Sequence, residues 1–160
     1  MEVRNLLEAM LDGYDLENKE TIISNCELAY SNPQTYLEKN DSLLFLQEMP
    51  NSVMNVAVPG ELSEILFMGD KIDEIHEKIQ DVYPDLPDFP YDQNFTGPEY
   101  FEWIDKYYSD NEINNELLQI GDSFGDDLFL ILVNRDRTDE IIRLSIAVKL
   151  YCKRAKNYLD

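Results

Sequence analysis

The chain has 160 residues and a formal net charge of -20, from 33 Asp and Glu against 13 Lys and Arg. Its length suits one domain with a real core, and its 10 Tyr, 7 Phe and 1 Trp exclude a disordered acidic tail. The charge disfavours nucleic acid and anionic membranes as partners, and it favours a basic protein, a bound cation or a high-salt environment.

The charge is unevenly distributed along the chain. Residues 1–134 hold 29 acidic side chains against 6 basic ones, whereas residues 135–160 hold 7 basic against 4 acidic. A halophilic protein would spread its acids over the whole chain, so the asymmetry argues against that explanation. We expect the basic C-terminal residues to pair with acids of the same molecule rather than with nucleic acid.

The location expected for the protein is the cytoplasm. The N-terminus is amphipathic and acidic, unlike a secretory signal peptide, and the longest apolar run, Leu128–Val133, has six residues. A membrane span needs about 20. Cys26 and Cys152 are therefore expected to be reduced thiols.

The first third of the chain predicts helices followed by a strand pair. Apolar spacing predicts helices over Val3–Leu11, ended by Gly13, and over Lys19–Tyr30, ended by Asn32-Pro33, with a helical turn through Tyr36 and Leu37. The apolar runs Ser42–Glu48 and Val53–Val58 flank Met49-Pro50-Asn51-Ser52, which predicts strand, turn, strand; the first run could also be helical.

The remainder predicts further helices around one strand. Helical spacing runs from Glu61 to Val82, interrupted at Gly69, and residues 81–97 form a loop stiffened by Pro84, Pro87 and Pro90. Then come helices from Pro98 to Tyr108 and from Glu112 to Leu118, a strand over Leu128–Val133 and a basic C-terminal helix over 138–159. The class predicted for residues 1–160 is one helix-rich α+β domain with a small antiparallel sheet.

The sequence contains only weak candidates for a catalytic site. The single histidine, His76, is expected to be exposed on a polar helix face, with no second histidine at metal-ligand spacing. Asp122, Asp126 and Asp127 lie in a glycine-bounded turn, which could be purely structural, hold Mg²⁺ or Ca²⁺, or contact a partner. We therefore expect no enzyme and no cofactor.

Two acidic features could bind a basic partner. Asp70, Asp73, Glu74, Glu77 and Asp81 form a stripe along one helix, which could equally be a solvated face.

The segment from Asp81 to Asp110 combines acids with nine aromatic residues, and rings set in an acidic frame suit an interface with a basic protein. The expected anchors are Tyr91, Trp103 and Tyr107. The expected charged frame comprises Asp85, Asp88, Asp92, Glu99, Glu102 and Asp105, joined by Asp73 and Glu77 from the stripe. The alternative is that the rings pack this segment onto the body of the protein.

One segment resembles a known family. Leu117 to Val133 reads LLQIGDSFGDDLFLILV, with Gly121, Asp122, Gly125 and Asp126 at the matching positions. It resembles the signature of the SMI1/KNR4-like (SUKH) superfamily, α+β proteins of which many are bacterial immunity proteins that neutralise nuclease and other toxins. The family's Leu-Pro, Tyr motif after an N-terminal helix and its Gly-x-Val-Tyr strand are missing here.

The leading hypothesis is a non-enzymatic inhibitor that binds a basic protein, either a toxin immunity protein or a phage-type counter-defence protein that mimics nucleic-acid charge. Two alternatives remain open. One is a metal-dependent hydrolase built on the Asp122, Asp126 and Asp127 turn, and the other is an accessory subunit of a larger assembly.

Overall fold

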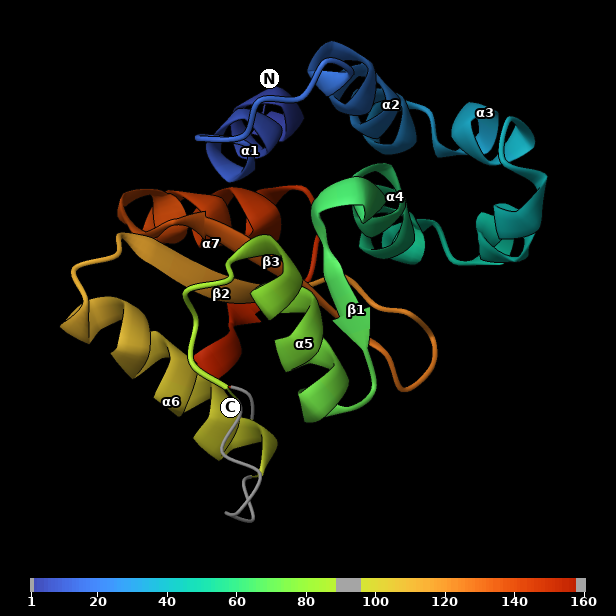
Figure 1. Ribbon diagram of the computed structural model, residues 1–160. Coiled ribbons are helices and arrows are strands. Elements are labelled where there is room, and N and C mark those ends of the chain that lie inside the picture. The colour runs from blue at the N-terminus through green and yellow to red at the C-terminus, as the bar shows by residue number, and fades with distance from the viewer. Residues whose placement is uncertain (1, 89–95, 158–160) are drawn as a thin grey trace.

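A small antiparallel sheet organises the fold, as the computed structural model shows for residues 2–88 and 96–157 (Figure 1). The sheet has four strands in the order β1-β3-β2-β4. Their bounds are β1 Phe67–Gly69, β2 Asn115–Ile120, β3 Leu128–Asn134 and β4 Cys152–Arg154. All pairings are antiparallel, and the long central pair β2–β3 aligns Leu118 with Ile131. The helix-rich α+β class is thereby confirmed.

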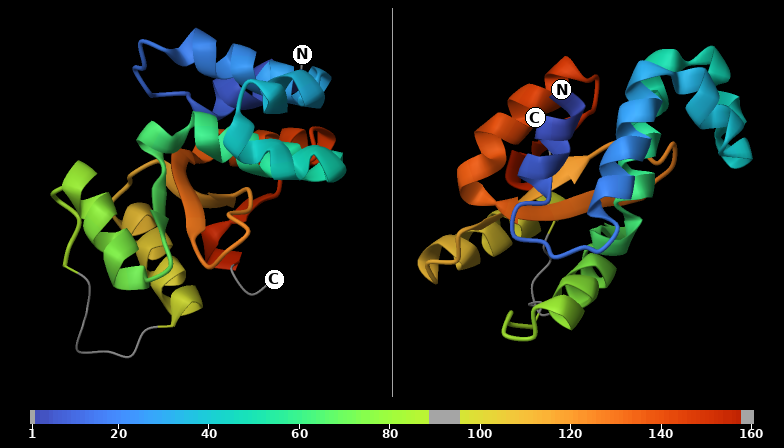
Figure 2. Two further views of the ribbon diagram at one scale, coloured as in Figure 1. Left: turned by 90° about the vertical axis from the view of Figure 1, so that its right-hand side faces the viewer. Right: turned by 90° about the horizontal axis from the view of Figure 1, so that it is seen from above.

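Helices cover both faces of the sheet (Figures 1 and 2). On one face lie α1 Glu2–Met10, α2 Lys19–Ser31, α4 Val53–Glu61 and α7 Thr138–Ala147, with α3 Pro33–Glu38 beyond them. On the other lie α5 Ile72–Val82 and α6 Gly97–Asp110. Alternate strand residues serve two cores: Leu118 and Ile131 pack towards α1, α4 and α7, whereas Leu117 and Leu130 pack towards α5 and α6.

The strand pair predicted near residue 50 is wrong. Asp41–Glu48 is a 3-10 helix, so the helical alternative for this run is the better one, and Val53–Val58 lies inside α4. Val53, Ala57 and Val58 are buried in α4. Burial on one helical face outweighs the weak strand preference of β-branched residues. The helix expected from Glu61 also begins only at Ile72, because β1 precedes it.

Two predictions near the C-terminus are also wrong. Most of the helix expected over Glu112–Leu118 is β2, which pairs with β3 on one side and with β4 on the other. The helix expected over 138–159 ends at Ala147. Lys149 has φ 61°, a left-handed conformation that redirects the chain into β4. Tyr151 and Cys152 therefore do not continue a helical face.

The most periodic elements are confirmed. The helices expected over Val3–Leu11 and Lys19–Tyr30 correspond to α1 and α2, and Leu128–Val133 lies within β3. A capping box opens α6, where Thr96 accepts from the backbone N–H of Glu99 and the Glu99 side chain from that of Thr96. Within residues 2–88 and 96–157, no helix has both the length and the apolar character needed to cross a bilayer.

Candidate functional site

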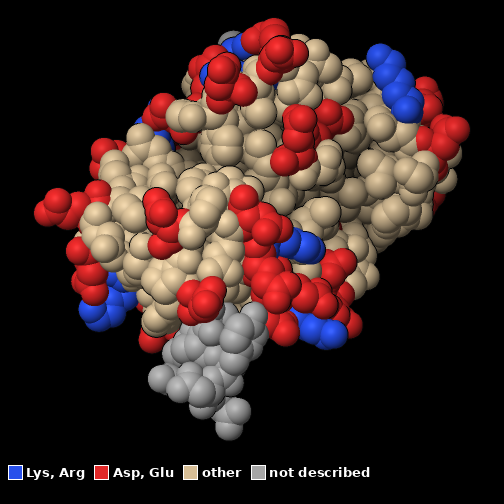
Figure 3. Space-filling view, in the orientation of Figure 1, with Lys and Arg blue, Asp and Glu red and all other residues tan. Residues whose placement is uncertain are grey.

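The predicted stripe and frame form one acidic face over α5, residues 83–88 and α6. We use "acidic face" for the exposed carboxylates of Asp70, Asp73, Glu74, Glu77, Asp81, Asp85, Asp88, Glu99 and Glu102. Figure 3 shows acidic side chains gathered over this half of the molecule, with few basic ones between them. The 3.6-residue period of α5 places its acids opposite the buried Ile75 and Ile79.

Little positive charge neutralises the acidic face. Lys71 forms an exposed ion pair with Glu74, and Lys78 donates to the backbone carbonyl of Met68. Asp70, Asp73 and Asp81 form no ion pair with any residue in the described ranges. Closely spaced carboxylates of this kind attract a positively charged partner and repel an anionic one.

The expected aromatic anchors are largely used for packing. Tyr100, Phe101 and Tyr108 are buried against α5 and the sheet, and Trp103 and Tyr107 are half-buried against the same core. The expectation that Trp103 and Tyr107 project from the surface is therefore wrong in part, because their positions on α6 flank its buried side. Tyr91 and Asp92 lie outside the described residues.

His76 is buried, contrary to prediction. Its Nε2 lies 2.8 Å from the Pro87 carbonyl, which can only accept, so Nε2 carries the proton and Nδ1 accepts from the Tyr100 hydroxyl at 2.9 Å. Burial lowers the pKa of His76, so the ring is neutral at pH 7. The His76 side chain holds residues 83–88 against α5 through its hydrogen bond to Pro87. Because it is fully buried, it is not accessible to a substrate.

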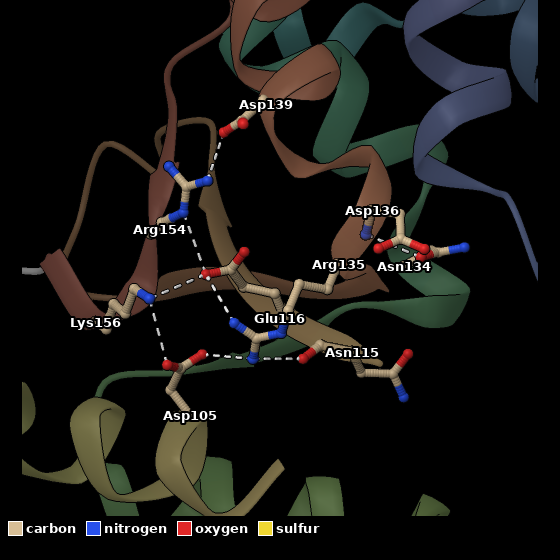
Figure 4. A network of polar contacts seen from close by, with 9 residues as sticks. All are labelled: Asp105, Asn115, Glu116, Asn134, Arg135, Asp136, Asp139, Arg154 and Lys156. Carbon is tan, nitrogen blue, oxygen red and sulfur yellow. Dashed lines mark hydrogen bonds and ion pairs between the residues drawn. The ribbon is translucent and has the colours of Figure 1, made fainter. Parts of the chain in front are cut away.

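Asp105 belongs to an internal charge network rather than to the charged frame (Figure 4). Arg135 lies 2.8 Å and Lys156 3.3 Å from its carboxylate. The same cations reach Glu116 at 3.7 and 3.6 Å, and Arg154 reaches it at 3.2 Å. A hydrogen bond to Asp139 raises the pKa of Arg154. The prediction that C-terminal cations pair with acids of the same molecule is confirmed.

Glu116 is the polar residue that sequence reasoning missed. It points from β2 into this network, and its side chain is only 3% exposed. The available signal was a charged residue directly before the apolar pair Leu117 and Leu118, since an isolated buried carboxylate is very unfavourable without partners. The network ties α6, β2 and β4 together.

The Asp122–Asp127 turn satisfies its own polar groups. The Asp122 carboxylate accepts from the backbone N–H of Phe124 at 2.8 Å, and Ser123 donates to the Asp127 carbonyl at 3.0 Å. Across residues 2–88 and 96–157, no three His, Cys, Asp or Glu side chains are placed to share a metal ion. The geometry supports the structural interpretation of this turn.

Two adjoining hollows open beside the acidic face and share Val82 and Tyr83. The larger, about 370 Å³, is lined by Tyr14, Phe67, Lys78 and Asp81 among others. The smaller, about 210 Å³, lies between residues 82–86 and the end of α6. Its lining combines apolar side chains with Asp85, Tyr107 and Tyr108. Both hollows are half-open to solvent.

The thiols offer no nucleophile. Cys26 is buried and Cys152 half-buried, and neither forms a disulfide. Burial raises the pKa of Cys152 to about 11 and that of Cys26 further, so both are protonated at neutral pH.

In the comparisons with known proteins, no family model, no curated protein and no solved structure matches the chain.

Proposed function

We propose that this chain is a non-enzymatic acidic inhibitor that binds a basic protein and covers that protein's functional surface. The expected targets are a nuclease toxin or a nucleic-acid-targeting defence protein, as for immunity and counter-defence proteins. The observation that carries the proposal is the division of charge within the molecule. The C-terminal cations Arg135, Arg154 and Lys156 are held by Glu116 and Asp105, whereas Asp70, Asp73 and Asp81 of the acidic face form no ion pair within residues 2–88 and 96–157.

The acidic face also has the rigidity that a binding surface needs. Residues 83–88 are fixed by hydrogen bonds from His76 to the Pro87 carbonyl and from Gln80 to the Leu86 carbonyl at 3.0 Å. A surface held in its bound shape loses less conformational entropy on association. The resemblance of residues 117–133 to the SUKH superfamily, which includes immunity proteins, points to the same kind of function.

The test is affinity capture with the tagged chain, followed by elution in a salt gradient. An inhibitor that acts through this face captures a basic, nucleic-acid-acting protein, releases it at moderate salt and suppresses its activity. Capture that withstands high salt, or a captured protein whose activity is unaffected, would contradict the proposal.

One observation favours an accessory-subunit function instead. Phe45 and Phe124 are 54% and 47% exposed, and their rings meet edge to face at 5.9 Å. Such an exposed apolar pair suits a permanent interface. If the isolated protein self-associates and Phe124→Ser abolishes the association, this second function gains support.

A further inference from the structure

The larger hollow lies where the sheet is incomplete. β1 pairs with only the first three of the seven residues of β3, and the chain before β1 forms a 3-10 helix over Ser63–Ile65 instead of a longer strand. The carbonyl of Leu132, beyond this pairing, accepts from the Tyr14 hydroxyl. The hollow is bounded by residues 64–67 and by the C-terminal turn of α5, which lies beside β1 (Figure 1).

The walls of this hollow are mainly apolar. Ile65, Leu66, Phe67 and Val82 line it, together with the ring of Tyr14. Val82 is 60% exposed and also lines the smaller hollow, so it stands between the two. We use "groove" for the two adjoining hollows. Exposed apolar surface of this kind gains free energy when a partner removes it from water.

Carboxylates lie at the groove. Glu64 and Asp81 line the larger hollow and Asp85 the smaller one, and all three side chains are exposed. None of them forms an ion pair with another residue of the described ranges. Lys78, in the lining of the larger hollow, donates to the Met68 carbonyl. A cation inside the larger hollow would meet Lys78, whereas a cation outside it would meet carboxylates.

We propose that the groove receives an aliphatic side chain of the basic partner, with lysine or arginine side chains on either side of it lying over Glu64, Asp81 and Asp85. The inference rests on the proposed function, since it names the segment of the partner that would bind beside the acidic face. The carboxylates favour a basic segment by charge complementarity, and the apolar walls favour an aliphatic residue at its centre.

The test is calorimetric titration with two blocked heptapeptides at low salt. Each contains six lysines, and the central residue is leucine in one and serine in the other. The two peptides carry equal charge, so the acidic face alone predicts equal affinity. Burial of the leucine in the groove predicts that the leucine peptide binds about fivefold more tightly or more.

Val82→Glu separates the groove from the effect of charge. The substitution adds a negative charge, so attraction by charge alone predicts that neither peptide binds more weakly. The groove predicts that the leucine peptide loses its advantage over the serine peptide. The fold should persist, because Val82 is exposed at the end of α5. Ile146→Glu is the matched control, at a residue 75% exposed on α7, and should preserve the advantage.

Equal affinity of the two peptides for the wild type, or an advantage of leucine that survives Val82→Glu, would overturn the groove as a binding site and leave the acidic-face proposal intact. Failure of both peptides to bind would contradict the proposed function as well. Self-association of the wild type that Val82→Glu abolishes would assign the groove to a second copy of this chain, and would also overturn the proposal.

Discussion

Gly121 occupies a position that no other residue can take without strain. Its φ is +68°, and a Cβ there would lie 2.4 Å from both the Asn55 carbonyl oxygen and Pro59 Cγ. We expect Gly121→Ala to lower the free energy of unfolding by roughly 2 kcal/mol or more, measured by urea denaturation. Gly60→Ala is the control, because a Cβ at Gly60 meets nothing within 4 Å. Equal stability of the two variants would refute this account of the turn.

His76 should make stability depend on pH. Burial lowers the pKa of His76 in the folded state, although the hydrogen bond to the Pro87 carbonyl and the charges of Asp88 and Glu77 oppose the shift. The unfolded chain therefore binds the proton first as the pH falls. The contribution of His76 to the free energy of unfolding is therefore constant above the pKa of the unfolded chain, near 6.5. It is lost as the pH falls towards the lower pKa that His76 has in the folded protein.

The measurement is the free energy of unfolding from pH 7.5 to 5 for the wild type and for His76→Gln. Protonation of carboxylates affects both proteins alike, so the difference between the two curves isolates the histidine. The wild type should lose more stability than the variant over this range. Parallel curves would show that His76 titrates normally in the folded protein.

At the scale of elements, Glu116 joins α6, β2 and β4. Replacing it by Gln leaves Arg135, Arg154 and Lys156 facing one carboxylate fewer. Because these cations are 27–35% exposed, we expect Glu116→Gln to cost about 1–3 kcal/mol rather than the larger value of a fully buried pair. Asp139→Asn, at a side chain 92% exposed, should change thermal stability little. Equal effects would show that the network is not structural.

Elements with a strong period were predictable from sequence. Apolar residues repeat at helical spacing through α1, α2 and α5, and a continuous apolar run marks β3, so local pattern and tertiary burial agree. The secondary structure of segments 53–58 and 112–118 was predicted wrongly because each segment is short. Their final states depend on partners distant in sequence, namely α2 for α4 and strands β3 and β4 for β2.

Of the candidate site, only the clustering of acidic residues was predictable from the sequence. Helical spacing was enough to place the α5 acids together on one exposed face. The same spacing rule, i, i+3, i+4, i+7, puts His76 with Ile72, Ile75 and Ile79, a signal that the prediction overlooked. Only tertiary packing shows that Asp105 faces Arg135 and that Tyr108 lines a hollow.

For the whole molecule, a net charge of -20 makes the folded state repel itself. We expect the melting temperature to rise between 20 and 300 mM NaCl, because salt screens that repulsion more than it weakens the few partly buried ion pairs. Differential scanning calorimetry measures this directly. A falling melting temperature would mean that attractive pairs dominate.

We propose that the location of negative charge on the molecule, and not its amount, determines binding. Two triple variants carry the same change in charge: Asp81, Asp88 and Glu102 to Lys on the acidic face, and Glu38, Asp41 and Glu48 to Lys at exposed positions on α3 and the adjoining 3-10 helix. The deciding measurement is the affinity of each variant for the captured partner by calorimetry. We expect the first set to weaken binding roughly tenfold to a hundredfold and the second to leave it near wild type. Equal losses from both sets, or none from the first, would contradict it.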